Sequence, residues 1–128
     1  MTAAEFPDDL KYTSEHEWAR REGELVRVGI TFYAQDALGD VVYVELPETG
    51  AVITQDAPFG EIQSPKAVSD LYAPVTGEIV ERNEEVIAAP ELINDDPYGK
   101  GWLVTIEPAG EASADLLTSD DYKKLIEQ

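Results

Sequence analysis

The chain has 128 residues, no cysteine, and 27 acidic against nine basic residues, for a formal net charge of −18. This length suffices for one domain with a packed core, and the missing cysteines exclude disulfides, thiolate metal sites and a cysteine nucleophile. The acidity excludes the basic footprint that nucleic acids and anionic membranes require. It suits solubility, for example in a salty interior, or docking to partners with basic faces.

The segment 11–18 is polar and ends in an aromatic residue, Trp18. It contains His16, the only histidine of the chain, so a histidine-rich metal site is excluded. A Ser-His-Asp arrangement built on Ser14 has no support beyond residue type, and we expect a structural histidine. Residues 20–24 then predict a turn, and the alternation in residues 25–30 predicts a strand.

A short helix is predicted over residues 32–38. Thr31 suits its N-cap and Gly39 its C-terminal stop. The β-branched and aromatic residues 41–46 that follow predict a well-buried strand, which Pro47 ends.

The segment 59–72 has the pattern of a β-hairpin. Strand-forming residues flank the sequence Ser-Pro-Lys-Ala at 64–67, which suits a type I turn with Pro65 in its second position. Lys66 would then stand at the tip. On turn chemistry alone, such a lysine is an ordinary solvated charge.

The second half of the chain continues with short strands and turns. Residues 77–83 and 102–106 predict strands, and residues 90–99 predict turns with one helical turn after Pro90. The whole pattern of short strands and frequent turns indicates an all-β sandwich or barrel. The acidic residues in the turn-rich segment lack the ligand spacing of a calcium loop; they are Glu91, Asp95 and Asp96.

The C-terminal residues from Ser119 onward predict a small helix, because acids come early and lysines late. Its packing stripe would consist of Tyr122, Leu125 and Ile126. No apolar run approaches the roughly 20 residues of a membrane span. Residues 1–9 also lack a signal or transit pattern, so we expect an intracellular soluble protein.

Four motifs resemble the H proteins of the glycine cleavage system. The most specific is the run Lys-Ala-Val-Ser-Asp-Leu-Tyr-Ala-Pro-Val at 66–75 followed by Gly77, which resembles their lipoyl-lysine segment. The others lie at 12–18, 29–47 and 90–104, so the resemblance covers roughly residues 12–122.

The resemblance implies the lipoyl/biotinyl-type hybrid barrel-sandwich of two antiparallel sheets, with a short internal helix and a small C-terminal helix. It implies a single domain, 1–128, with an N-terminal segment of about 1–22, a core of about 23–110 and a helical tail of about 111–128. Localisation would be cytoplasmic in a prokaryote, or in the mitochondrial matrix of a eukaryote after removal of a transit peptide.

The function that the resemblance implies is a non-catalytic carrier with lipoate attached to Lys66. Glycine decarboxylase (P protein) would load an aminomethyl group, the tetrahydrofolate-dependent aminomethyltransferase (T protein) would remove it, and dihydrolipoamide dehydrogenase (L protein) would reoxidise the dithiol. A lipoate-attaching enzyme would be a further partner, and we expect a monomer. The absence of a supported catalytic constellation agrees with a carrier, because the cofactor supplies the reactive atoms.

Glu17 and Asp70 lie in these motifs, and we expect them to contact the cationic amine of the loaded arm. The chain departs from the family at the hairpin, where Gln63 and Pro65 replace the usual Glu and Val, and at residues 32–33, which are aromatic. Gln63 removes a charge that lipoate-attaching enzymes would recognise.

Three alternatives stay open. An H-like paralogue would carry lipoate for another pathway, such as sulfur oxidation or lipoyl relay. A biotinyl module shares the hairpin logic but expects Met on both sides of its lysine, which Pro65 and Ala67 do not provide. A small enzyme would show turnover without lipoate.

Overall fold

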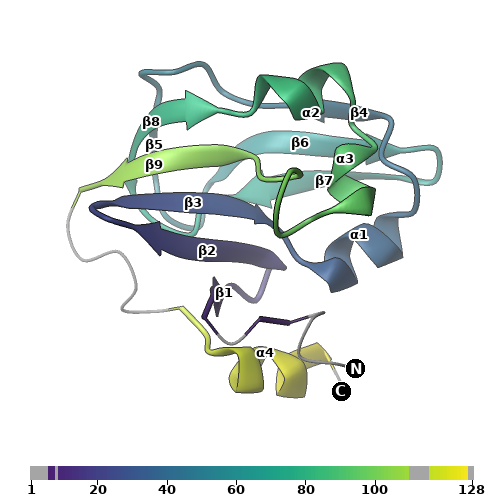
Figure 1. The fold of residues 1–128 in the computed structure, drawn as a ribbon, viewed down its shortest axis with the longest axis horizontal. Helices are drawn as coiled ribbons and strands as arrows, with labels where there is room; N and C mark the ends of the chain where they lie inside the picture. The colour runs from purple at the N-terminus through teal and green to yellow at the C-terminus, as the bar shows by residue number, and fades with distance from the viewer. Residues whose placement is uncertain (1–5, 8, 110–115, 127–128) are drawn as a thin grey trace.

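The computed structural model describes residues 6–7, 9–109 and 116–126, and it contains two antiparallel sheets that face one another (Figure 1). The larger sheet has the order β1 (Lys11–Tyr12), β2 (Glu17–Glu22), β3 (Leu25–Ile30), β9 (Val104–Pro108), β8 (Gly77–Arg82) and β5 (Val52–Ile53). The smaller sheet has the order β4 (Tyr43–Glu45), β6 (Pro58–Ser64) and β7 (Ala67–Tyr72). The predicted two-sheet sandwich is therefore confirmed.

The main core lies between the sheets because alternate residues of each strand point inward. Val28 of β3, Ile62 of β6 and Ile79 of β8 are fully buried there. A second cluster joins the N-terminal segment to the C-terminal helix. Its buried members are Phe6, Leu10, Tyr12, Trp18 and Tyr122.

Both predicted helices are present. In α1 (Phe32–Leu38), the Thr31 side chain accepts from the backbone N–H of Ala34, and Gly39 ends the helix with φ of 79°. The C-terminal helix is α4 (Ser119–Ile126), and the predicted helical turn after Pro90 is α3 (Leu92–Asp95). Within the described residues, no helix has the length and apolar character needed to cross a membrane.

One helix was not predicted. Asn83 caps α2 (Glu84–Ala88) by accepting from the backbone N–H of Glu85. The signal was present in the sequence, because Asn followed by two glutamates is a typical helix start.

Several predicted boundaries were wrong. The turn placed at 20–24 is shorter, because β2 pairs with β3 as far as Glu22 and Leu25. No strand was predicted for the polar segment 11–18, which contains β1 and the start of β2. The last strand begins at Val104 instead of residue 102.

Two predictions of burial were also wrong. The strand predicted at 41–46 shrinks to β4 and is only half buried, with Val42 57% and Tyr43 47% exposed. One face of the smaller sheet meets solvent because the sheet is one layer of a sandwich, and β4 also lies at its edge, where it has one neighbouring strand. In α4, Leu125 is 37% exposed, whereas Tyr122 is buried as predicted.

The hairpin turn consists of two residues, Pro65 and Lys66, because Ser64 pairs directly with Ala67. Among described residues other than glycine, positive φ occurs only at His16 and Asp56. A negative φ at both turn residues excludes turn types II, I′ and II′ and agrees with the predicted type I turn.

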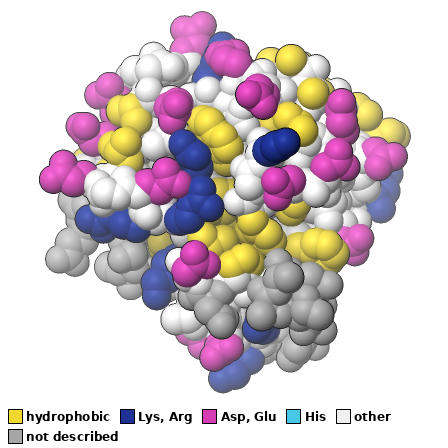
Figure 2. All heavy atoms as spheres, viewed as in Figure 1, with side chains coloured by type: hydrophobic (Ala, Val, Ile, Leu, Met, Phe, Trp, Pro, Cys, Tyr) yellow, Lys and Arg dark blue, Asp and Glu magenta, His cyan; other side chains and the backbone are white. Residues whose placement is uncertain are grey.

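Acidic side chains cover much of the surface. In the view of Figure 2 they are scattered over the whole face, with hydrophobic atoms visible between them near its centre. On the outer face of the smaller sheet, the register aligns Glu45, Glu61 and Asp70 in one row across the three strands. Such like-charged neighbours repel one another.

The close pairing of β8 with β9 predicts an effect of Gly77→Ala. A Cβ at Gly77 would lie 2.7 Å from Cγ2 of Ile106 and 2.9 Å from Cα of Pro108. Because backbone cannot move aside cheaply, we expect a loss of roughly 2–4 kcal/mol in the free energy of unfolding, measured by urea denaturation. The control is Gly23→Ala, because a Cβ at Gly23 would have no atom within 4 Å. Its φ of 66° is unfavourable for alanine, so the free energy of unfolding should fall by only about 1 kcal/mol. Equal losses in the two variants would contradict this explanation.

Candidate functional site

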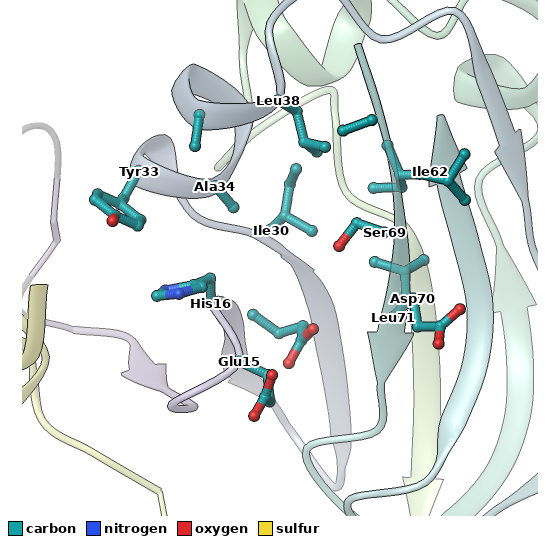
Figure 3. A pocket seen from close by; sticks show the side chains of 14 residues that line it. Glu15, His16, Ile30, Tyr33, Ala34, Leu38, Ile62, Ser69, Asp70 and Leu71 are labelled. Carbon is teal, nitrogen blue, oxygen red and sulfur yellow. The ribbon is translucent and has the colours of Figure 1, made fainter. Parts of the chain in front are cut away.

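A groove of about 420 Å³ runs between α1 and β7, beginning beside the hairpin tip (Figure 3). Its walls are mainly apolar: Ala34 and Leu38 come from α1, and Ile30 and Ile62 come from the two sheets. The remaining lining residues are Glu15, His16, Glu17, Tyr33, Ala37, Ala67, Val68, Ser69, Asp70 and Leu71.

One side of the groove is the free edge of β7. This strand is the outer strand of its sheet, with β6 on its other side. In a two-residue hairpin the flanking pair is hydrogen-bonded, so the bonded pairs here are Ser64 with Ala67 and Ile62 with Ser69. The backbone groups of Val68 and Asp70 consequently point away from β6, toward the groove edge.

Lys66 is exposed at the mouth of the groove. Its side chain passes next to the C-terminal end of α1, since a Cβ built on Gly39 would lie 3.4 Å from Cε and 3.9 Å from Nζ of Lys66. A group attached to Nζ therefore starts close to the space between α1 and β7.

The deepest polar group of the groove is Glu17, which is only 1% exposed. One carboxyl oxygen accepts from the hydroxyl of Thr13 at 2.7 Å, and the other accepts from the backbone N–H of Tyr72 at 3.2 Å. Burial raises the pKa of Glu17 to about 8, although these hydrogen bonds oppose the shift. Glu17 is thus predominantly protonated at neutral pH.

A tight turn over residues 13–16 presents this carboxyl group. The backbone N–H of Thr13 donates to the carbonyl of Glu17 at 2.9 Å, and the N–H of His16 donates to the carbonyl of Thr13 at 3.1 Å. His16 adopts φ of 75°, a left-handed conformation that costs energy in a residue with a Cβ. The surrounding contacts must supply this energy.

The side chain of His16 is held from the C-terminal helix. Its Nδ1 lies 2.8 Å from the hydroxyl of Tyr122, which also lies 2.8 Å from the hydroxyl of Thr31. Burial lowers the pKa of His16, and burial also raises that of Tyr122. Both groups are therefore neutral at neutral pH, and His16 is tied into the fold as a structural residue would be.

The structure does not bring Asp70 and Glu17 together. Asp70 contributes to the wall of the groove, but alternation along β7 places its side chain opposite those of Ser69 and Leu71. In Figure 3 the carboxylate of Asp70 points away from the side on which the hydroxyl of Ser69 lies. It is exposed beside Glu61 on the outer face.

Sequence reasoning missed the apolar wall of the groove. The signal was the spacing of Ala34 and Leu38 with Ala37, which places all three on one face of a short helix. In the turn-rich segment, Asp96 accepts from the backbone N–H of Lys100 at 3.0 Å, a local structural role. The described part of the chain holds no group of three or more His, Cys, Asp or Glu suited to a metal ion.

The arrangement is suited to holding an apolar chain that starts at Lys66 and ends near a buried carboxyl group. Apolar walls exclude water along the path, and Glu17 can accept hydrogen bonds or, after losing its proton, pair with a cation.

Comparisons with known proteins agree on one family. Residues 10–128 match the family model described as Glycine cleavage H-protein. A glycine cleavage system H protein of Carboxydothermus hydrogenoformans is 53% identical over 95% of this chain and 95% of its own length. A probable glycine cleavage system H protein of Natronomonas pharaonis is 54% identical over 94% of this chain and 95% of its own. The crystal structure of a glycine cleavage system H protein from Mycobacterium marinum is similar with a TM-score of 0.89 and 43% identity, covering 95% of this chain and 99% of that one.

The buried carboxyl of Glu17 predicts a pH dependence of stability. Because its folded pKa of about 8 lies above the ordinary glutamate value of 4.5, the folded chain binds the proton more tightly than the unfolded chain. Stability should therefore fall as pH rises from about 4.5 to about 8, by at most roughly 5 kcal/mol from this group. Glu17→Gln should lack this pH-dependent part of the free energy of unfolding. Urea denaturation of both proteins at pH 5, 6.5 and 8 measures the difference. Parallel curves for the two proteins would show that Glu17 is not the cause.

Proposed function

Because the chain belongs to the glycine cleavage H-protein family, we propose that Lys66 is the residue to which the family's lipoate is attached. The observation that carries the proposal is the position of Lys66 on a two-residue turn at the mouth of an apolar groove. An exposed amine on a rigid turn is accessible to an attaching enzyme, and the groove beside it can receive an apolar arm. The amine of Lys66 and the apolar groove beside it therefore fit lipoate.

The family's function is that of the lipoyl carrier of the glycine cleavage system. Lipoate supplies the sulfur atoms that the cysteine-free chain lacks. We propose as partners glycine decarboxylase, the aminomethyltransferase, dihydrolipoamide dehydrogenase and a lipoate-attaching enzyme. The chain itself would be non-catalytic: it tethers the arm, which replaces free diffusion by a high effective concentration at each docked enzyme.

Within the groove, the role proposed for Glu17 is to receive the amine of the loaded arm. A cationic amine next to the carboxyl group favours its ionised form, so Glu17 would lose its proton as the amine enters. The apolar walls would keep water from the labile group. Asp70, whose carboxylate faces outward, would add only a longer-range negative potential.

The remaining proposals concern organisation. Residues 1–128 would act as one domain, monomeric, and located in the cytoplasm of a prokaryote. Gln63 and Pro65 at the hairpin favour a second candidate, an H-like carrier that serves another pathway, since they alter the surface that the attaching enzyme meets. Glycine-dependent release of CO2 with the partner enzymes distinguishes the two.

The attachment site is tested by intact mass after incubation with lipoate and a lipoate-attaching enzyme. The wild type should gain one lipoyl group, and Lys66→Arg should gain none, because arginine keeps the charge but cannot be acylated in the same way. Lys100→Arg is the matched control at another lysine in a turn, and it should be modified like the wild type. Gain of mass by Lys66→Arg, or none by the wild type, would refute the assignment.

The role of Glu17 is tested by the lifetime of the loaded group on the isolated carrier. Glu17→Gln keeps the shape, its Oε1 can still accept from the N–H of Tyr72 and its Nε2 can donate to the hydroxyl of Thr13, but it cannot become an anion. Release should therefore be roughly tenfold faster or more. Asp70→Asn should change the rate by less than about twofold, and the double variant should match Glu17→Gln. Release rates that are unchanged in Glu17→Gln would sink the proposal.

A further inference from the structure

We propose that the segment 94–98 is a clamp that positions α1 as the wall of the arm groove, an inference that rests on the proposed function of Lys66. This segment belongs to the fourth motif of the sequence, to which the carrier function assigns no role. Its hydrogen bonds to Phe32, Gln35, Gly39 and Val41 lie in α1 and in the loop that leaves it, so its effect on the groove passes through α1.

Asn94 holds the C-terminal end of α1 with three hydrogen bonds. Its Oδ1 accepts from the backbone N–H of Val41 at 2.8 Å. Its Nδ2 donates to the carbonyl of Gly39 at 2.9 Å and to the side-chain oxygen of Gln35 at 3.0 Å. One side chain thus fixes both the helix and the loop that leaves it.

Tyr98 holds the N-terminal end of α1, and Pro97 anchors the segment to the larger sheet. The hydroxyl of Tyr98 accepts from the backbone N–H of Phe32 at 2.9 Å, which satisfies one of the unpaired donors at the start of α1. The carbonyl of Pro97 accepts from Nε1 of the buried Trp18 at 2.9 Å. The segment is therefore itself anchored to β2, close to the turn that presents Glu17.

The groove lies on the opposite side of α1. Its lining side chains from this helix are Tyr33, Ala34, Ala37 and Leu38, whereas Gln35 is buried on the face toward α3, with which α1 is in contact (Figure 1). A helix of seven residues is too short to hold its own conformation in water, so tertiary contacts decide where it lies. The segment 94–98 contacts α1 at both ends of the helix.

The clamp also reaches the mouth of the groove. Gly39, whose carbonyl binds Asn94, adopts φ of 79° and ψ of −157°, a conformation that is essentially restricted to glycine. The Lys66 side chain passes beside it. Losing the Asn94 contacts would free this backbone and let α1 move relative to the arm, which would admit water to the groove.

The chain provides a matched control in Asn83. It is also a capping asparagine with three hydrogen bonds: its Nδ2 donates to the carbonyls of Lys100 at 2.8 Å and Trp102 at 2.7 Å, and its Oδ1 accepts from Glu85. It braces α2, which does not line the groove. Asn83→Ala should therefore lose comparable stability without changing the groove.

The experiment compares Asn94→Ala, Tyr98→Phe and Asn83→Ala as lipoylated full-length proteins loaded by glycine decarboxylase. All three should accept one lipoyl group at the wild-type rate, because the hairpin is unchanged. Release of the loaded group should be about five- to tenfold faster in Asn94→Ala and about two- to fivefold faster in Tyr98→Phe. Asn83→Ala should release at the wild-type rate. Hydrogen exchange of the α1 amides should accelerate only in the first two.

The outcomes separate the two proposals. Equal release from Asn94→Ala, Tyr98→Phe and the wild type overturns the clamp, as does equal acceleration by Asn83→Ala. If Asn94→Ala fails to fold, Tyr98→Phe decides, because it keeps the ring and removes only the hydroxyl that accepts from Phe32. If the wild type gains no lipoyl group, the proposed function fails instead; exchange of the α1 amides then still tests the clamp, and unchanged exchange in both variants overturns it.

Discussion

A buried carboxyl group links the two sheets in addition to the core packed between them. Glu17 starts β2 of the larger sheet, yet it accepts a hydrogen bond from Tyr72, the last residue of β7 in the smaller one. Burying a carboxyl group is unfavourable unless it is hydrogen-bonded and neutral, and both conditions are met here. The turn that bears His16 and the end of β7 meet at this junction, and both line the groove. The same group that joins the sheets therefore supplies the polar end of the groove.

The groove is bordered by a stiff hairpin on one side and by a short helix, α1, on the other. The hairpin that carries Lys66 is stiff, because Pro65 fixes φ and the register runs from Ser64 to Ala67 without an intervening residue. The opposite wall is a short helix that tertiary contacts hold in place. Under the proposed function, attachment of lipoate to Lys66 would depend mainly on the first, and retention of the arm would depend on the second. A carrier needs both properties, because its cargo must be accessible to several enzymes and protected between visits.

Local features were predictable from the sequence, and distant ones were not. The Thr31 cap, the Gly39 stop and the two-residue turn with Pro65 follow from residues within a few positions of one another. The burial of Glu17 could not be predicted, because it depends on Tyr72, which is far away in the sequence. The same holds for β1, which pairs with β2 and forms a bridge from Tyr12 to Leu117. The exposure of Val42 and Tyr43 reflects an edge position that only the topology reveals. The carboxylate direction of Asp70 follows from strand register, which a motif does not contain.

The free edge of β7 has a consequence for how the protein coexists with copies of itself. An outer strand with unpaired backbone groups is a template onto which another chain can add a strand, which is a route to aggregation. Here that edge borders the groove, and α1 and the turn at 13–16 form its opposite wall. The N–H of Tyr72 is already hydrogen-bonded to Glu17. Both α1 and this turn lie across the groove from β7, on the side from which a neighbouring strand would have to approach. The walls opposite β7 thus restrict access to the edge at which sheet extension would begin.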